Sequence, residues 1–285
     1  MEQQQRQKVV IVTGANKGIG YALVEKLVQQ YPNYKVILTA RNPTLGEEAR
    51  QNLTQKYPTA KNNLFVQKLD IKNSKDQDEF FQAIRNTYGK IDILVNNAGV
   101  SAMSPGASET YEDLFGTNYH ATVDLTEKLL PLLADDARVI MISSLLGQLS
   151  YQTSVYEKFL SQSLTIDQIN SKLKEIKQAS LTGKPEDFAK ANGLYSLSKA
   201  FLNAYVRWVL ALRLKPNQSV VTLHPGLCET DCNGWCKSEE IRKFGTPKTA
   251  EEGTKTALHV IGLDNQSSRQ VNGSFFDDEA NIIVY

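Results

Sequence analysis

Two groups of residues have types and spacings that suit chemistry. The first is Thr13–Gly20, with the sequence TGANKGIG, which places three glycines between a short apolar run and a helical pattern. A helix N-terminus gathers unpaired amide groups and the positive end of the helix dipole, so such a turn can hold a phosphate. The second is Tyr195 with Lys199, which a helix would place one turn apart on the same face. A nearby ammonium lowers the pKa of a phenol from about 10, which makes the phenol a better proton donor at neutral pH.

Neither pattern alone identifies a functional site, because glycines also form plain turns and the tyrosine–lysine spacing occurs elsewhere in the chain. The same spacing is found in Tyr31 with Lys35 and in Tyr57 with Lys61, but in both of these pairs proline follows the tyrosine and favours a loop. Position favours Tyr195, which lies in a long helical pattern. That pattern continues through Leu202, Tyr205, Val206, Val209, Leu210 and Leu212.

The elements that must position these groups alternate between strands and helices. Such alternation predicts an α/β fold with a Rossmann-type, doubly wound parallel sheet, and we interpret residues 1–285 as a single domain. Runs that are apolar throughout, such as Val9–Val12 and Val139–Ile142, need helices on both faces of the sheet. The predicted strands are Val9–Thr13, Val36–Thr39, Leu64–Leu69, Ile91–Val95, Arg138–Ile142, Ser219–Leu223 and Ser274–Phe276.

One connection is much longer than the others. Between Ser144 and the helix that begins near Gly193 lie roughly 50 residues, where 2–6 are usual. Thr165 and Gln168 form a capping-box pair there. Helical spacing follows at Ile166, Ile169, Leu173 and Ile176. We therefore predict a helical insertion at about 149–191, before the helix of Tyr195.

The residues after the second predicted strand indicate which dinucleotide binds. An NAD site places an acidic residue there against the ribose 2′-hydroxyl. Here Thr39–Asn42 contains no carboxylate, whereas Arg41 and Lys17 can hold a 2′-phosphate by charge-assisted hydrogen bonds. The alternative is that both are solvated surface cations. We favour NADP(H) over NAD(H).

In this order, the motifs resemble those of the short-chain dehydrogenase/reductase family. The long insertion makes the chain most similar to the monomeric, NADPH-dependent carbonyl-reductase branch of that family. The matching motifs cover almost the whole chain. They are Thr13–Gly20, Leu69–Ile71, Asn96–Gly99, Thr117–Asn118, Ser143–Ser144 with Gly147, Tyr195 with Lys199, and Pro225–Gly226 with Thr230.

The resemblance implies four catalytic residues. Tyr195 would protonate the carbonyl oxygen as hydride arrives from the nicotinamide, while Lys199 would lower the pKa of the phenol and hold the ribose hydroxyls. Ser144 would donate a hydrogen bond to the substrate oxygen, where negative charge develops. We choose it over Ser143, which is then structural, because the family's catalytic serine precedes a glycine by three residues. Asn118 would hold a water that relays protons to Lys199, or would instead bond the local backbone.

The resemblance also implies the cofactor-binding residues. Asp70 would meet the adenine amine, Asn96–Gly99 would line the cofactor with backbone, and Thr230 would lie near the carboxamide. Each of them is equally typical of a turn at the end of a strand. The predicted cofactor-binding residues are Gly14, Asn16, Lys17, Gly18, Ile19, Gly20, Arg41, Asp70, Ile71, Asn97, Ala98, Gly99, Tyr195, Lys199, Pro225, Gly226 and Thr230.

His224, Cys228, Cys232 and Cys236 follow one another at steps of four, which would place four metal ligands on one helical stripe. The proline and glycine directly after the histidine break such a helix, and zinc sites usually show tighter ligand pairs. Buried thiols that act as small apolar groups are the simpler interpretation. We predict no metal site and no disulfide framework.

Composition excludes several classes of partner. The chain has 32 basic and 31 acidic residues, so no net field draws in nucleic acid or an anionic membrane. No secretory signal and no stretch near the roughly 18 apolar residues of a membrane helix is present. We therefore expect a cytoplasmic protein that binds neither nucleic acid nor membrane. By the resemblance, the insertion covers the face through which other members tetramerise, so we expect a monomer.

The expected substrate is a small carbonyl compound. Its pocket would be formed by the insertion with Val100–Gly106, Leu145–Tyr151 and Cys228–Phe244, and apolar side chains such as Leu145 and Trp235 suit aldehydes, ketones or quinones. A carbonyl reductase is the first hypothesis. The second is a dedicated secondary-alcohol dehydrogenase for a steroid, terpenoid or alkaloid ketone. The third is a non-catalytic dinucleotide-binding sensor, against which the intact catalytic residues argue.

Overall fold

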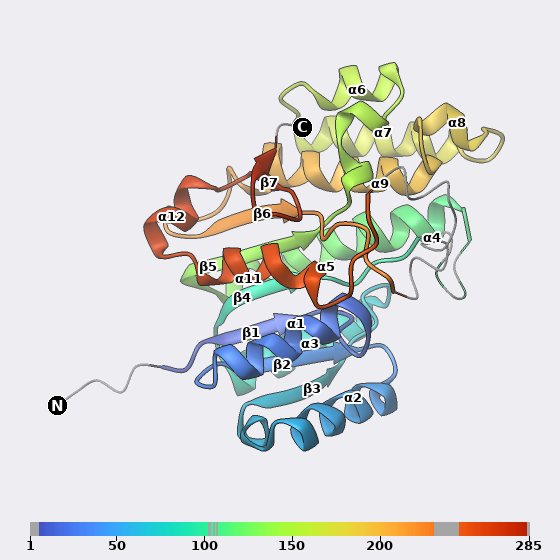
Figure 1. Ribbon diagram of the computed structural model, residues 1–285. Coiled ribbons are helices and arrows are strands. Elements are labelled where there is room, and N and C mark those ends of the chain that lie inside the picture. Colours follow the sequence, from blue (N-terminus) through green and yellow to red (C-terminus); the bar gives the residue numbers. More distant parts are fainter. Residues whose placement is uncertain (1–5, 102–103, 105, 107, 231–244, 284–285) are drawn as a thin grey trace.

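The computed structural model describes residues 6–101, 104, 106, 108–230 and 245–283. They form one eight-stranded sheet in the order β3-β2-β1-β4-β5-β6-β7-β8, with helices on both faces (Figure 1). Neighbouring strands are parallel except for β8, which pairs antiparallel with β7. The strands are β1 (Val9–Val12), β2 (Lys35–Ala40), β3 (Leu64–Lys68), β4 (Ile91–Asn96), β5 (Leu133–Ile142), β6 (Ser219–Leu223), β7 (Phe275–Phe276) and β8 (Ile282–Ile283). The predicted doubly wound α/β fold is confirmed.

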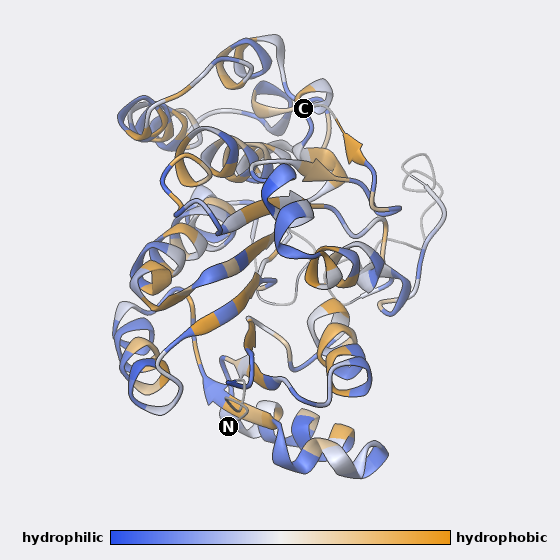
Figure 2. Ribbon diagram, turned by 90° about the vertical axis from the view of Figure 1, so that its left-hand side faces the viewer, coloured by the Kyte–Doolittle hydropathy of each residue, from blue (hydrophilic) through white to orange (hydrophobic). Residues whose placement is uncertain are grey.

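Helices cover the sheet on both sides, and Figure 2 shows hydrophobic next to hydrophilic residues along them, as expected for helices with one packed side. Among the described residues, the α-helices are α1 (Gly18–Gln30), α2 (Pro43–Lys56), α3 (Ser74–Thr87), α4 (Tyr111–Phe115), α5 (Thr122–Leu129), α6 (Ser154–Leu160), α7 (Ile166–Ala179), α8 (Pro185–Phe188), α9 (Gly193–Tyr205), α11 (Lys255–Gly262) and α12 (Asn265–Gln270). Shorter 3₁₀ or π turns are η1 (Pro58–Asn62), η2 (Gly116–Ala121), η3 (Leu130–Leu132), η4 (Leu145–Gly147), η5 (Leu149–Tyr151), η6 (Val206–Leu210) and η8 (Glu252–Thr254). None of the helices in these ranges is long and apolar enough to span a bilayer.

Strand β1 shows why the central strands are apolar throughout. Successive side chains of a strand point to opposite faces of the sheet. Val9 and Ile11 pack into the core under α3, α5 and α9, whereas Val10 and Val12 pack into the core under α1, α2 and α11. All four side chains are buried, as the pattern predicted.

The order of the strands reverses direction at β1. The chain runs from β1 outward through β2 to β3, and then returns to place β4 on the other side of β1. At such a switch point the connections leave in opposite directions, and a crevice opens at the carboxyl ends of the strands. The glycine turn after β1 and the segment after β4 therefore meet at this crevice.

The long connection is the helical insertion that the sequence predicted. Thr165 caps α7, and its reciprocal hydrogen bonds with Gln168 form the expected capping box. Ile169, Leu173 and Ile176 are buried in one core with α9, whereas Ile166, at 37% exposed, faces away from that core. Helices α6, α7 and α8 lie together beside α9, at the top of Figure 1.

Three details differ from the predictions. Strand β5 begins at Leu133 rather than Arg138, because the polar residues Asp135 and Asp136 interrupt the apolar run without ending the strand. Strand β8 was not predicted, since two residues are too short to show a period. The helical run that begins with α9 ends at Leu210, and Leu212 is 75% exposed in the turn that follows.

Candidate active site

A cavity of about 730 Å³ opens at the carboxyl edge of the sheet, and most of the predicted site residues line it. Because these residues come from the ends of β1, β2, β3, β4, β5 and β6 and from α9, the fold brings together motifs far apart in the sequence. The predicted residues that line the cavity are Gly14, Asn16, Lys17, Gly18, Ile19, Arg41, Asp70, Ile71, Asn97, Ala98, Gly99, Ser144, Tyr195, Lys199, Pro225, Gly226 and Thr230. Gly20 and Asn118 are not among its lining residues.

The glycine turn has the backbone conformation that its sequence indicates. Gly14 and Gly18 both adopt a φ of 60°, in the left-handed region that side chains disfavour. Helix α1 begins at Gly18, and the side chain of the N-cap residue Lys17 makes no capping hydrogen bond. The first turn of α1 therefore presents its amide groups at the cavity without a side-chain cap, which suits an anion.

Gly20 has a different role from the one predicted. We predicted it as a cofactor-binding residue of the glycine turn, but a Cβ atom at this position would meet Asn97 Nδ2 at 2.4 Å and the Cα of Ala15 at 2.9 Å. These neighbours belong to the protein, and Gly20 is buried rather than at the cavity. Gly20 therefore permits close packing of α1 against the turn and β4.

Thr13 joins the glycine turn to the end of β4, a role that the sequence reasoning missed. Its hydroxyl accepts hydrogen bonds from the backbone amides of Asn97 and Ala98, both at 2.9 Å. The Asn97 carboxamide returns two donations, to the Thr13 carbonyl at 2.9 Å and the Gly14 carbonyl at 3.2 Å. The two motifs thus fix each other. The signal that could have indicated this contact is a threonine and an asparagine placed directly after two apolar strand patterns.

Two cations lie at the part of the cavity formed by β2 and the glycine turn. Arg41 directly follows β2, Lys17 precedes α1, and both side chains are exposed and line the cavity. The next residue, Asn42, caps α2 by accepting hydrogen bonds from the amides of Thr44 and Leu45. No acidic residue occupies this end of β2, so the local charge favours an anionic group.

Tyr195 and Lys199 lie one turn apart on α9, as predicted. The phenol is half-buried at the cavity, while Lys199 is only 5% exposed. The ammonium donates a hydrogen bond to the Ile142 carbonyl at 3.0 Å, which holds it at the end of β5. Gly99 lies close to this cation and to Asn118, since a Cβ atom on Gly99 would be 3.4 Å from the Lys199 ammonium and 3.2 Å from Asn118 Oδ1.

The two serines after β5 have separate surroundings. Ser144 lines the cavity, and its hydroxyl accepts a hydrogen bond from the Leu146 amide at 3.2 Å. Ser143 is 4% exposed and its hydroxyl donates to the Lys199 carbonyl at 3.5 Å. Gly147 lets α9 approach this turn, because a Cβ there would meet the Lys199 Cβ at 3.1 Å.

Asn118 lies in the π-helical turn η2 and is 1% exposed. Its carbonyl oxygen accepts from the Val100 amide at 2.9 Å, and its amide donates to the Val100 carbonyl at 2.9 Å and to the Ser198 hydroxyl at 3.1 Å. These partners are distant in sequence, so the alternative of a local backbone bond is wrong. Asn118 joins the segment after β4 to α9, and the proton relay stays a prediction.

The substrate side differs from the prediction. Of the cavity-lining residues in the described ranges, none lies between 149 and 191, because the insertion packs on the outer side of α9. The predicted wall at Cys228–Phe244, including Trp235, falls largely on residues 231–244, outside those the structure describes. Other parts of the prediction are confirmed, since Val100 and Ser101 from Val100–Gly106 and Leu145 and Leu146 from Leu145–Tyr151 line the cavity. The polar residue Asn192 also lines it and was not predicted. Asn192 has a φ of 60° before a glycine, a turn signal that the Asn-Gly dipeptide carries.

Cys228 is fully buried, and its thiol donates a hydrogen bond to the Pro225 carbonyl at 3.2 Å, in agreement with the interpretation of a small buried thiol. Cys232 and Cys236 lie outside the described residues. Within the described ranges, no group of three or more His, Cys, Asp or Glu side chains is arranged to hold a metal ion.

Comparison with known proteins identifies the class. Residues 8–157 match the family model of the short-chain dehydrogenases, and the chain belongs to this family. It is therefore an oxidoreductase, and membership indicates a nicotinamide dinucleotide as the cofactor.

Two sequences and one solved structure show which members of the family the chain is similar to. The chain is 31% identical to (+)-neomenthol dehydrogenase of Arabidopsis thaliana, over 94% of this chain and 95% of that protein. It is 28% identical to carbonyl reductase [NADPH] 3 of Rattus norvegicus, over 90% of this chain and 91% of that protein. The solved structure of salutaridine reductase from Papaver somniferum superposes with a TM-score of 0.79 at 28% identity, and covers 95% of this chain and 100% of that one.

Proposed function

We propose that this protein reduces a carbonyl group of a small molecule to an alcohol with NADPH. The observation that carries the proposal is the single cavity lined by the glycine turn, Arg41, Ser144, Tyr195 and Lys199. The relatives named as NADPH carbonyl reductases support it. Aldehydes, ketones and quinones are the proposed substrates.

Tyr195 would donate its proton to the carbonyl oxygen. The hydride for the carbonyl carbon would come from NADPH when it is bound. The buried ammonium of Lys199 stabilises the phenolate that remains when the proton has left. The Ser144 hydroxyl donates a hydrogen bond to the same carbonyl oxygen, where charge develops. Asn118 would hold the water through which Lys199 recovers a proton.

The residues around the cavity fit NADPH. The uncapped first turn of α1, with Gly14 and Gly18, would hold the pyrophosphate, and Lys17 and Arg41 would hold the 2′-phosphate. For the remaining cofactor we propose adenine against Asp70. Backbone contacts would come from Ile71, Asn97, Ala98, Gly99, Pro225 and Gly226, with Thr230 near the carboxamide.

A dedicated secondary-alcohol dehydrogenase is the second candidate. Two of the most similar proteins, (+)-neomenthol dehydrogenase and salutaridine reductase, are named for a single compound each. An enzyme of this kind would act on one ketone or its alcohol rather than on many carbonyl compounds.

The test is loss of NADPH absorbance with a panel of aldehydes, quinones and ketones, repeated with NADH. Broad activity with NADPH supports the carbonyl reductase, and one responsive ketone supports the dedicated enzyme. A flat trace across the panel, together with measured binding of NADPH, would contradict both and favour a sensor. Faster turnover with NADH would contradict the choice of cofactor.

We also propose a cytoplasmic monomer. The insertion supports this state, because α6, α7 and α8 bury Leu160, Ile169, Leu173 and Phe188 against α9 and so occupy one side of that helix. Sedimentation velocity tests it, and a tetramer would contradict it.

A further inference from the structure

We infer that the substrate carries, besides its carbonyl group, a second neutral oxygen function that binds in a separate polar subsite. The inference rests on the proposed carbonyl reduction and names the substrate class more closely. The subsite is a cavity of about 450 Å³ next to the active-site cavity, with which it shares Leu145, Gly226 and Leu227. A molecule held by Ser144 and Tyr195 therefore has this cavity beside it.

His224 gives this cavity a buried hydrogen-bond donor. The residue ends β6, is 4% exposed and lines the cavity. Its Nδ1 accepts a hydrogen bond from the Gly226 amide at 3.3 Å. Burial lowers the pKa of the imidazole, and the opposing effects of Asp278 and Asp277 do not reverse this, so the ring is neutral at pH 7. Because a neutral ring with an accepting Nδ1 carries its proton on the other nitrogen, Nε2 is a donor.

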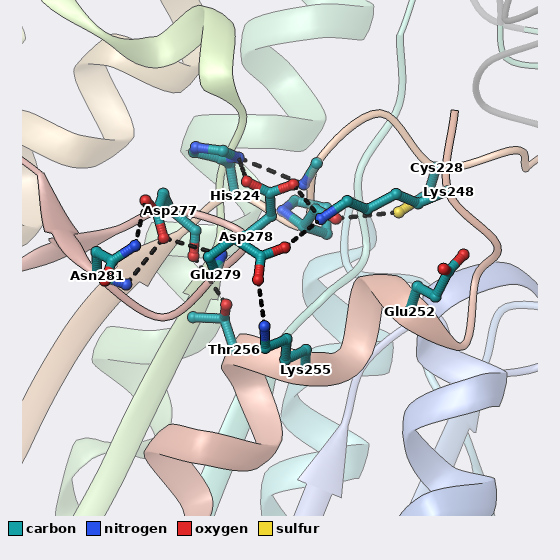
Figure 3. A network of polar contacts seen from close by, with 12 residues as sticks. His224, Cys228, Lys248, Glu252, Lys255, Thr256, Asp277, Asp278, Glu279 and Asn281 are labelled. Carbon is teal, nitrogen blue, oxygen red and sulfur yellow. Dashed lines mark hydrogen bonds and ion pairs between the residues drawn. The ribbon is translucent and has the colours of Figure 1, made fainter. Parts of the chain in front are cut away.

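That donor lacks a partner in the described part of the chain. The contacts of the His224 ring nitrogens are made at Nδ1, to Gly226 and to Asp278 at 4.0 Å (Figure 3). Because His224 lines the cavity and no described residue accepts from Nε2–H, this donor is available to an accepting atom of a ligand.

Gln148 and Thr246 add neutral polar groups to the same cavity. Within the described ranges, neither side chain makes a hydrogen bond, although the Gln148 backbone is fixed by its donation to the Leu145 carbonyl at 3.1 Å. Gln148 follows Ser144 after the 3₁₀ turn η4. At about 2 Å per residue this turn separates the two positions by roughly 8 Å, which sets the scale between the two oxygens of the substrate.

The charged groups of this wall are already paired with each other. Lys248 binds Asp278 at 2.6 Å and Glu279 at 2.7 Å, as the dashed lines in Figure 3 show. Asp277 accepts from the amides of Glu279 and Asn281 and from the Asn281 side chain. An ionic ligand would have to compete with these pairs, whereas the neutral groups remain available. A hydroxyl or second carbonyl is therefore the group that this cavity suits.

The probes are methyl ketones of increasing chain length, each compared with the ω-hydroxy ketone that has the same number of heavy atoms. Binding is measured by calorimetry to the NADPH complex of Tyr195→Phe, which does not depend on turnover. We expect the hydroxy ketone to bind more tightly than its methyl counterpart at one intermediate chain length. Gln148→Leu in the same background should remove about tenfold of that preference, the effect of one hydrogen bond.

Gln178→Leu is the matched control, since Gln178 is exposed on α7 and lines neither cavity. It should leave the preference unchanged, and melting temperatures should show that both variants fold. Equal binding of the two ketones at every length, or an unchanged preference in Gln148→Leu, overturns the subsite. If the preference is present but the wild type reduces neither ketone, the proposed reduction fails and the subsite stands as a binding site.

Discussion

The two ends of the active-site cavity are held together in different ways. At the cofactor end, Thr13 and Asn97 bond each other directly, because they follow adjacent strands β1 and β4. At the proposed substrate end, Leu227 and Glu229 line the cavity, and both form backbone hydrogen bonds with Lys248. The Lys248 side chain forms ion pairs with Asp278 and Glu279, near the end of the chain. The cofactor end is thus fixed by short motifs and the substrate end by distant ones. Changes at one end should leave the binding at the other end intact.

The largest effect is expected from Arg41→Asp at the cofactor end. The substitution removes charge-assisted hydrogen bonds to a 2′-phosphate and adds repulsion, so the Kd for NADPH should rise by about 100-fold while that for NADH changes little. Fluorescence titration with both dinucleotides measures this. Arg85→Asp is the control, because Arg85 lies exposed on α3 outside the cavity. Equal loss for both cofactors contradicts the assignment of Arg41.

Gly147→Ala tests the close packing of η4 against α9, which lies between the two ends. A Cβ there meets Asn203 Nδ2 at 2.9 Å and the Lys199 Cβ at 3.1 Å, so the Asn203 side chain must move and Lys199 must be displaced slightly. We expect kcat to fall about tenfold, because displacement of Lys199 disturbs the geometry that the reaction needs.

The control for this glycine is Gly116→Ala. A Cβ at Gly116 meets only Lys72 Cε, at 3.8 Å, and the residue does not have a positive φ. Steady-state kinetics should therefore show little change. A wild-type kcat in Gly147→Ala would contradict the inference that turnover depends on the close packing of η4 against α9.

His224 makes the substrate end sensitive to acid. Its pKa is lowered in the folded protein, mainly by burial, so the unfolded chain takes up the proton first. The stability that depends on a neutral His224 is present above the unfolded pKa of about 6.5 and is lost as the pH falls below it. The melting temperature should fall between neutral and mildly acidic pH, and less steeply in His224→Gln. Parallel curves for both proteins would count against this role.

The smallest effect is expected at Glu279. Hydrogen bonds from Lys248 and Lys255 lower its pKa to about 2 from an ordinary 4.5. Its contribution to stability is therefore present above about 4.5 and is lost as the pH falls toward 2. Because the carboxylate is exposed, Glu279→Gln should lower the melting temperature only slightly at pH 7 and not at all near pH 2. A large fall in melting temperature at pH 7 would show that the ion pairs of Glu279 stabilise the protein more than we infer.

The sequence predicted the local geometry of the proposed cofactor end, because the signals for this geometry are local, whereas the contacts of these residues with a cofactor stay a prediction. Gly14 and Gly18 are required by a positive φ within the turn itself, and the Tyr195–Lys199 spacing expresses one turn of α9. The reason for Gly20 was misjudged, since the atoms that exclude a side chain there come from Asn97, far along the chain.

Fewer contacts of the substrate end were predicted, because they too join residues that are far apart in the sequence. Lys248, Asp278 and Glu279 carry no motif, and only the pairing of the chain's last strands brings them beside β6. The insertion had clear helical periodicity, but periodicity does not reveal whether a helix packs at a cavity or on the outer side of α9. The apolar face of α7 packs into the core with α9 rather than at the cavity.

The central claim, that the Tyr195 phenol protonates the substrate, is tested most directly by NADPH consumption in Tyr195→Phe beside Tyr31→Phe, whose tyrosine has the same spacing to a lysine outside the cavity. Loss of the general acid should lower kcat/KM by about 100-fold to 10,000-fold with the Kd for NADPH unchanged, while Tyr31→Phe keeps wild-type turnover. Turnover by Tyr195→Phe at the wild-type rate would contradict the account.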